Sequence, residues 1–413
     1  MRVLGICNFW VGTAVYRVHG ASSDDRAGHS SSRPRTAAGR PGKQPVSREQ
    51  TNSMPLHHIA GHPGPASGKS GHVLSVGSAG VRPSAVSEVR RDERLAMFAT
   101  AAHRATRGTG WILPIHGRVF RPPDGRAAKA ALAIALKTGF GVSPDSLNRL
   151  VFDERCALML GDNCQDRRIV VSVAGTDFQF SPTDRYGQFR GTILIPDEVA
   201  AAHVSSAGLE ISAKLGARDH RRFARNIQLI GPEGLSVISD IDDTVKVTHV
   251  SSRRRMMALT FLQAFEAVGG MAERYRSWVA QGASLHFISS SPWPLYEPLE
   301  TFLTVAGFPA ATITLKNVAL KDRSIRNLLA KATKTKPPAI DAILADFPKR
   351  QFVLIGDSAE NDAEIYADAA RRHGPQIKRI LIRDCGGRRS GIERARKGGR
   401  TASDARLKCG GLP

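Results

Sequence analysis

The sequence LSVISDIDDT at residues 235–244 decides the fold of the second half of this chain. It starts as an apolar run, as buried strands do, and changes at Asp240 into a cluster of acids. Because side chains alternate along an extended segment, Asp240 and Asp242 are expected to point the same way. Two close carboxylates repel each other unless a cation lies between them, so the pair implies a divalent ion.

Such a pair can divide the work of a phosphoryl transfer. Asp240 would attack phosphorus, while Asp242 would give a proton to the leaving oxygen and later take one from water. Thr244 can set the turn through a local hydrogen bond, and it is a candidate contact for the substrate phosphate. The same run could instead be an ordinary acidic loop or a calcium-type cluster. The residues that follow the other predicted strands distinguish these interpretations.

From residue 232 to residue 385, apolar strand patterns alternate with helical patterns. Strands are predicted over 235–239, 285–288, 352–355 and 380–382, and helices over 254–268, 271–281, 296–305, 325–331, 338–346 and 363–373. This alternation predicts an α/β fold, a doubly wound parallel sheet with helices on both faces. Ligand sites in such sheets lie at the carboxyl ends of the strands.

Hydroxyl groups follow the second predicted strand of this sheet. Ser289 and Ser290 come directly after it, where they can hold a phosphate oxygen, although an ordinary serine turn is the alternative. A lysine is also needed to neutralise the phosphate charge during attack. Spacing alone does not choose among the candidates Lys316, Lys321, Lys334 and Lys336.

Acids follow the third predicted strand. Asp357 stands at its end, and Asp362 lies five residues further on. Magnesium prefers hard oxygen ligands and retains some of its waters, so Asp357 is suited to bind Mg²⁺ directly or through water. Asp362 could hold one of those waters, or it could simply begin a helix.

The region before this sheet, residues 92–231, predicts a small β-rich, sandwich-like domain. Helices are predicted over 93–106 and 127–137, and strands over 111–119, 168–173, 192–195, 209–213 and 227–230. The segment 1–91 is rich in Ser, Gly, Pro, Arg and His and is expected to be disordered. Residues 386–413 are expected to form a loose basic tail.

The 413 residues carry a formal net charge of +22, which favours anionic partners such as phosphorylated substrates, anionic membranes or nucleic acid. Five scattered cysteines lack metal-type spacing and indicate neither a disulfide framework nor a zinc site, although Cys156 and Cys164 could bridge a loop. The chain has no uninterrupted apolar stretch of about 18 residues, so we expect no transmembrane helix. Residues 1–15 make a poor secretory signal, and we expect a cytoplasmic location.

The motifs, taken in order, resemble the haloacid dehalogenase superfamily. In more detail they are similar to the actin-patch-protein type of phosphatidate phosphatase catalytic domain. The matching segments are VISDIDDTVK at 237–246, FISSSPWPLY at 287–296, and FVLIGDS at 352–358 with Asp362 and EIY at 364–366. The resemblance covers roughly residues 230–385 and, more weakly, the β-rich region before them.

The resemblance implies a role for each matching residue. Asp240 would be the nucleophile, Asp242 the general acid and base, and Ser289 a phosphate-binding residue. Asp240, the main-chain carbonyl of Asp242, and Asp357 would ligate Mg²⁺, with Asp362 as a further acidic residue of the metal site. The family lysine stands eleven residues before a Phe-Pro pair, which selects Lys336 here, preceded by Thr335 where the family usually has His.

The resemblance implies a magnesium-dependent phosphatidate phosphatase that works through an aspartyl-phosphate. Peripheral contact with an anionic membrane would fit the basic charge. The main alternative is a phosphatase of the same mechanism that acts on a soluble phosphomonoester, a phosphoprotein or a nucleic-acid end, and nucleic acid is the least expected of these partners. A binding or structural protein with an inactive site is a third interpretation.

Overall fold

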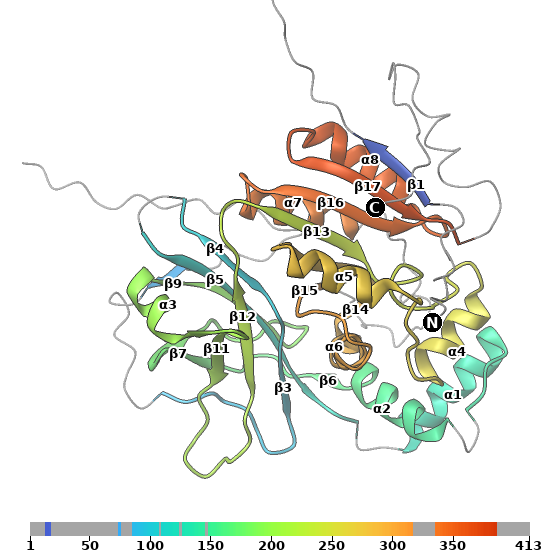
Figure 1. Cartoon of the computed structure of the whole chain (residues 1–413). Helices are drawn as coiled ribbons and strands as arrows, with labels where there is room; N and C mark the ends of the chain where they lie inside the picture. Colours follow the sequence, from blue (N-terminus) through green and yellow to red (C-terminus); the bar gives the residue numbers. More distant parts are fainter. Residues whose placement is uncertain are drawn as a thin grey trace, which may run out of the picture.

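The computed structural model describes residues 85–106, 109–123, 126–144, 148–316 and 335–385, and two strands earlier in the chain. These residues form a mixed α/β structure, with a helix-covered sheet beside a β-rich region (Figure 1). Most of the segment expected to be disordered, the basic tail and the helix predicted over 325–331 lie outside the described residues. Among the described residues, no helix is both long enough and apolar enough to cross a bilayer.

The sheet that carries the acids is built around β13 (Leu235–Asp240). Its strand order is β1-β17-β16-β13-β14-β15. The four strands that run parallel in this sheet with β13 are β14 (Ser284–Pro292), β15 (Thr312–Lys316), β16 (Gln351–Asp357) and β17 (Ile377–Arg383). At the edge, β1 (Thr13–Arg17) joins β17 in the antiparallel sense. Parallel pairing brings the carboxyl ends of β13, β14 and β16 to one edge.

Both faces of this sheet are buried. Successive residues of β13 point to opposite faces, and each face packs against its own core. Val237 packs in one core with three helices, α4 (Arg253–Phe261), α5 (Met271–Ala280) and α6 (Tyr296–Val305). The next residue, Ile238, packs in the opposite core with α7 (Lys336–Asp346) and α8 (Asp362–Arg372). Helices on both sides explain why successive residues of the strand are buried, including Ser236 and Ser239.

The β-rich region forms a second, separate core. One hydrogen-bonded path links its strands in the order β2-β9-β5-β4-β12-β11-β7-β8. The strands of this path are β2 (Val73–Ser75), β4 (Ala101–Arg104), β5 (Trp111–Arg121), β7 (Val170–Val173), β8 (Thr176–Gln179), β9 (Gln188–Ile195), β11 (Gly208–Ala213) and β12 (Ala224–Leu229). Shorter elements flank it: β3 (Arg94–Met97), β6 (Asp162–Asn163), α3 (Asp197–His203) and β10 (Val204–Ser205). The division into two packed sheets that a sandwich requires stays a prediction.

The helix predicted over 93–106 is wrong, because this segment forms β3 and β4. Leu95 and Met97 face the core of the β-rich region, whereas Ala96 and Phe98 face the core of the parallel sheet. A strand buried on both faces has no polar alternation, so its apolar run does not distinguish it from a helix. Order also begins earlier than predicted, since the Ser87 hydroxyl donates to the Val170 carbonyl at 3.0 Å.

The helix predicted over 254–268 stops early, at Phe261. The residues that follow lie beside the acidic loop: the Val247 amide donates to the Glu266 carbonyl, and the Val268 amide donates to the Val245 carbonyl, both at 2.9 Å. These tertiary bonds hold the segment out of the helix. The short strand β15 is a further element that the sequence patterns did not predict.

Two helices of the β-rich region pack on the parallel-sheet side. α1 (Arg126–Phe140) and α2 (Arg149–Met159) both contact α4, and their buried Leu136 and Phe152 share a core with Val237. The predicted domain boundary after residue 231 stays a prediction, because residues on either side of it contribute to this core. Cys156 and Cys164 are free thiols, so the alternative in which they bridge a loop is wrong.

Candidate active site

The loop after β13 turns sharply, and Asp243 holds it. Asp243 has a φ of 54°, in the left-handed region. Its carboxylate accepts from three successive amides, those of Thr248 and His249 at 2.8 Å and of Val250 at 2.7 Å. These bonds offset the backbone strain and fix the segment 240–250 around the two acids before it.

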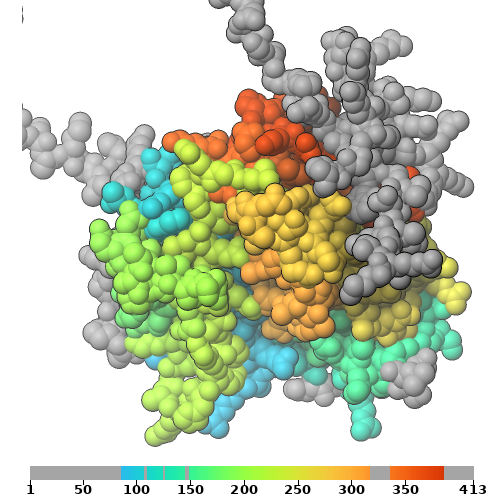
Figure 2. Space-filling view, in the orientation of Figure 1, coloured from blue at the N-terminus to red at the C-terminus, as the bar shows by residue number. Residues whose placement is uncertain are grey.

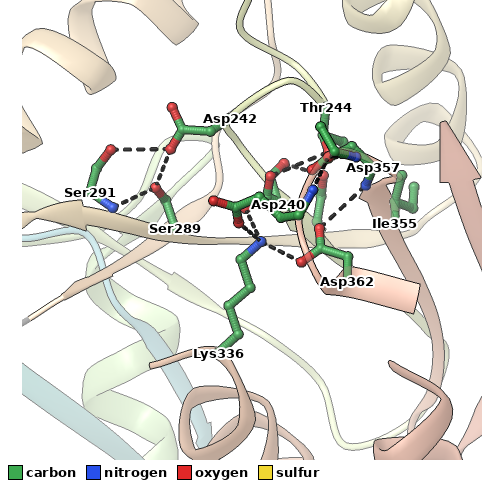
Figure 3. Close-up of polar contacts among 12 residues, drawn as sticks. Asp240, Asp242, Thr244, Ser289, Ser291, Lys336, Ile355, Asp357 and Asp362 are labelled. Atoms are coloured by element: carbon green, nitrogen blue, oxygen red, sulfur yellow. Dashed lines mark hydrogen bonds and ion pairs between the residues drawn. The ribbon is translucent and has the colours of Figure 1, made fainter. Parts of the chain in front are cut away.

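Asp242 is held by four side chains. Its Oδ1 lies 2.7 Å from Lys246 Nζ and accepts from the Thr248 hydroxyl at 2.9 Å. Its Oδ2 accepts from the hydroxyls of Ser289 at 2.7 Å and Ser291 at 3.1 Å (Figure 3). Burial by itself raises the pKa of Asp242, but the Lys246 ammonium and these hydroxyls outweigh it and lower the pKa to about 2.

Asp240 is fully buried and faces Lys336. Lys336 Nζ lies 2.8 Å from Asp240 Oδ1, 2.8 Å from Glu360 Oε2 and 2.5 Å from Asp362 Oδ1 (Figure 3). Burial raises the pKa of Asp240 well above its usual range; Lys336 opposes this effect, while the nearby Asp362 and Glu360 add to it. One lysine therefore faces more negative charge than it can neutralise.

The excess of carboxylates fits a cation. Oxygens of Asp240, Asp357 and Glu360 lie within 4.8 Å of one another. Asp357 Oδ1 accepts from the amides of Ala359 at 2.6 Å and Glu360 at 2.9 Å, but its Oδ2 is buried without a hydrogen-bond partner. Mg²⁺ prefers hard carboxylate oxygens as ligands, and a buried carboxylate oxygen without a hydrogen-bond donor is free to bind a cation.

The structure brings most of the predicted site residues together. Asp240, Asp242, Asp357 and Asp362 lie at the carboxyl edge of the sheet with Ser289, Thr244 and Lys336. The Thr244 hydroxyl donates to Asp240 Oδ2 at 3.3 Å. Ser289 donates to Asp242, whereas the neighbouring Ser290 hydroxyl is buried without a hydrogen-bond partner.

The positions of the lysine candidates favour Lys336. Lys321 and Lys334 lie outside the described residues. Lys316 ends the edge strand β15, and burial lowers its pKa. Lys336 is fully buried at the start of α7 and touches three carboxylates.

Asp362 and Glu360 differ from the sequence expectation. Asp362 was predicted in the metal site, but its Oδ1 pairs with Lys336 and its Oδ2 accepts from the Asp357 amide at 3.3 Å. Glu360, which was not predicted as a site residue, supplies the third oxygen of the group that it forms with Asp240 and Asp357, called the acidic group below. The acid-rich turn 356–362 indicated in the sequence that acids gather here. The spacing within this turn does not tell which of its acids points toward Asp240.

Lys246, Thr248 and Ser291 were also missed as site residues. They lie close to the predicted Asp242 and Ser289 in sequence, but their contacts depend on the turn set by Asp243. A lysine four residues after an acid is common on solvated surfaces, so spacing gave no reason to single out Lys246.

The β-rich region reaches the site through the turn after the serines. The rings of Trp293, Phe98 and His116 contact one another, and the Trp293 centroid lies 4.2 Å from that of Phe98 and 4.5 Å from that of His116. The Tyr296 hydroxyl accepts from the Ala99 amide at 2.7 Å. The residues that follow Ser291 are therefore packed against side chains of the β-rich region that face the core of the parallel sheet.

Comparison with known proteins agrees with this arrangement. Residues 235–384 match the family model described as phosphatidate phosphatase APP1, catalytic domain. The chain is 34% identical to phosphatidate phosphatase APP1 of Saccharomyces cerevisiae over 169 residues, which is 38% of this chain and 27% of that protein. It is 27% identical to an uncharacterized protein of Schizosaccharomyces pombe over 247 residues, 56% of this chain and 40% of that protein.

The chain spans well under half the length of both curated relatives. A solved structure of the class C acid phosphatase from Bacillus anthracis aligns with 41% of this chain and 80% of its own at 14% identity, and its TM-score of 0.23 is too low to bear on the fold. The match to the family model confirms the resemblance to the APP1 type of catalytic domain for residues 235–384.

Proposed function

We propose, from the premise that residues 235–384 are a catalytic domain of the phosphatidate phosphatase APP1 type, that this chain is a Mg²⁺-dependent phosphatidate phosphatase. The observation that carries the proposal is the pairing of two buried carboxylates in different environments. Asp240 faces Lys336 and the acidic group, whereas Asp242 faces Lys246 and hydroxyls. Two acids held apart in this way suit two different roles. We also assign the sheet to the doubly wound, haloacid dehalogenase-like class.

The first step forms a covalent intermediate. A carboxylate oxygen of Asp240 attacks phosphorus, and the bond between phosphorus and the ester oxygen breaks. Asp242 is ionised in the free site, because its pKa is lowered to about 2. A phosphomonoester that binds as its monoanion brings a proton, and its negative charge raises the pKa of Asp242, so that Asp242 takes up this proton. Asp242 then gives the proton to the leaving oxygen, which releases diacylglycerol and leaves an aspartyl-phosphate on Asp240. Lys336, 2.8 Å from Asp240, offsets negative charge as the phosphate approaches.

The second step restores the enzyme. Asp242, now ionised, takes a proton from a water molecule, whose oxygen attacks the phosphorus of the aspartyl-phosphate. The bond between phosphorus and Asp240 breaks, and inorganic phosphate leaves. Ser289 and Ser291 keep Asp242 in one orientation during both proton transfers, because both hydroxyls donate to its Oδ2. We assign contacts with the phosphate oxygens to Thr244, whose hydroxyl donates to Asp240, and to Ser290, whose buried hydroxyl has no hydrogen-bond partner among the described residues.

Asp240, Asp357 and Glu360 would hold the magnesium ion, with the main-chain carbonyl of Asp242 as a further ligand. When bound, Mg²⁺ neutralises charge on the phosphate and on the carboxylates. In our assignment Asp362 acts as a positioning residue, since its oxygens hold Lys336 and the Asp357 amide.

The preferred substrate is phosphatidate, because the matching family model carries that activity in its description. A cytoplasmic enzyme that touches an anionic membrane peripherally would meet this substrate, and the net charge of +22 supports such contact. A soluble phosphomonoester, a phosphoprotein or a nucleic-acid end remains the alternative, since the catalytic residues act on the phosphate alone.

Phosphate release by the purified full chain tests the proposal. We expect release from phosphatidate with Mg²⁺, loss of release with EDTA, and loss in Asp240→Asn. Asp341→Asn is the matched control, because Asp341 lies on α7 and pairs with His373 away from the acidic group. Release from soluble esters but not from phosphatidate would assign the alternative substrates. Equal release by wild type and Asp240→Asn would exclude catalysis by this site.

A further inference from the structure

The helix α1 has an apolar outer face. Leu132 and Leu136 are buried against the core, as expected for a packed helix. The opposite side carries Ala127, Ala130, Ala131 and Ile134, which are all exposed; the adjacent Ala130 and Ala131 lie three or four residues from Ala127 and from Ile134. Ile134 is 62% exposed. The outer face of a helix on a globular protein is normally polar, so this ridge needs an explanation.

A second apolar side chain lies on the neighbouring helix. Leu150 of α2 is 85% exposed, and α2 packs against both α1 and α4. The three helices form one corner of the molecule (Figure 2). Ile134 and Leu150 are two of the five large apolar side chains that are exposed among the described residues.

The same corner is strongly basic. The cations outside the core are Arg126, Lys129, Lys137, Arg149, Arg253, Arg254 and Arg255. Against Asp153 and Glu154 they give these three helices a surface charge of +5. Arg254 lies beside Gly141, directly after the end of α1, so the first turn of α4 adjoins the carboxyl end of α1.

The corner is joined to the active site by a short, fixed connection. α4 begins at Arg253, five residues after Thr248, whose hydroxyl donates to Asp242. The amides of His249 and Val250 in between are bonded to Asp243. α1, α2 and α4 lie on the side of the molecule toward which β13 points (Figure 1).

We propose that the outer face of α1, Leu150 of α2 and the first turn of α4 form a docking surface for an anionic lipid bilayer. Exposed apolar side chains on helices that also carry cations suit the interface of a bilayer, where they can enter between headgroups that the cations attract. An acidic protein would use the charge but leave the exposed ridge without a purpose. The inference rests on the proposed function, because only a lipid substrate gives a reason for docking beside this site.

Vesicle flotation of the full chain tests the docking surface separately from catalysis. The vesicles contain phosphatidylcholine alone or with phosphatidylserine, which supplies negative charge without a phosphomonoester. We expect binding only with phosphatidylserine, and weaker binding as salt rises. The double variant Ile134→Glu/Leu150→Glu should bind at least tenfold more weakly. Val305→Glu is the control, since Val305 is 82% exposed at the end of α6, which returns to the amino edge of the sheet.

A second pair of double variants tests the contribution of the positive charge to vesicle binding. Arg253→Ala/Arg254→Ala should weaken binding by about thirtyfold, which is the attraction of two cations to an anionic surface. Lys349→Ala/Lys378→Ala removes two exposed cations at the amino ends of β16 and β17, the opposite edge of the sheet, and should not weaken it.

Activity on a short-chain, monomeric phosphatidate separates the two proposals. Wild type and the docking variants should release phosphate from it equally, while the variants lose activity on vesicles that contain phosphatidate. No release by wild type would overturn the proposed function. Normal release by wild type, together with vesicle binding that none of the docking variants weakens, would overturn the docking surface alone.

Discussion

The indole of Trp293 stacks on the ring of Phe98, with centroids 4.2 Å apart and planes 26° apart. Trp293 belongs to the turn after β14, and Phe98 directly follows β3 of the β-rich region. Two residues before Trp293, the Ser291 hydroxyl donates to Asp242. The β-rich region thus fixes the segment that orients the proposed general acid.

Replacing Phe98 by Leu should lower turnover by more than the loss of folding stability alone would explain. The change keeps an apolar side chain but removes the stacking, worth about 0.5–1.5 kcal/mol for an aromatic pair. With the turn looser, we expect kcat on a soluble ester to fall severalfold and KM to change little, measured at a temperature where the variant stays folded.

Phe178→Leu is the matched control for this change, since Phe178 is 1% exposed in the core of the β-rich region. If both variants lost stability and turnover equally, Phe98 would have a packing role only.

Glu360 and Asp362 should respond differently when each loses its charge. Glu360→Gln should weaken Mg²⁺ affinity, because Glu360 belongs to the group of facing oxygens. Asp362→Asn should leave Mg²⁺ affinity closer to wild type and reduce turnover, because it removes a partner of Lys336. The measurement is the rise in Tm with added Mg²⁺, since a ligand of the folded state stabilises it more at a given concentration when it binds more tightly.

The reverse order, with Asp362→Asn abolishing the Mg²⁺-dependent rise and Glu360→Gln preserving it, would return Asp362 to the metal site. Asp341→Asn should show the full wild-type rise.

Lys246→Gln should destabilise the protein and change its pH dependence. In the wild type the folded-state pKa of Asp242 is lowered to about 2, so its contribution is present above the unfolded pKa, near 4, and is lost as pH falls toward 2. Without Lys246, burial raises the pKa of Asp242, so the folded state then binds a proton more tightly than the unfolded state. We expect a loss of about 3 kcal/mol at pH 7, as for a broken buried ion pair, and a smaller loss at pH 4.

Urea unfolding at the two pH values measures this difference. Lys214→Gln is the control, because the Lys214–Asp177 pair is partly exposed and should contribute under about 1 kcal/mol. An equal loss for Lys246→Gln at pH 7 and pH 4 would contradict the proposed role of the Lys246–Asp242 pair.

Gly356→Ala should disable the site without touching a catalytic side chain. A Cβ at this position would lie 2.3 Å from Asp362 Oδ2 and 2.6 Å from Asp362 Cβ. Asp362 would have to move, and Lys336 would lose a partner. We expect at least about a tenfold fall in kcat, as for a small displacement of positioned groups, by phosphate release.

Gly139→Ala gives the contrast, since a Cβ there meets no atom within 4 Å and Gly139 lies in α1. It should keep full activity on a soluble ester and gain about 0.5–1 kcal/mol of stability. Activity of Gly356→Ala equal to that of Gly139→Ala would show that Asp362 needs no fixed position.

The sequence alone was enough to locate Asp240, Asp242, Ser289 and Asp357 at strand ends and to predict the alternating α/β pattern, because hydrophobic period and polar strand ends are local properties. Lys336 needed the family resemblance, since no local pattern distinguishes one lysine from another. Only the tertiary structure decided that Glu360 of the turn 356–362 faces Asp240 and Asp357, and that Lys246 pairs with Asp242. It also turned the segment 93–106 into two strands between two cores. These features depend on contacts between residues far apart in sequence, whose geometry exists only once the chain has packed.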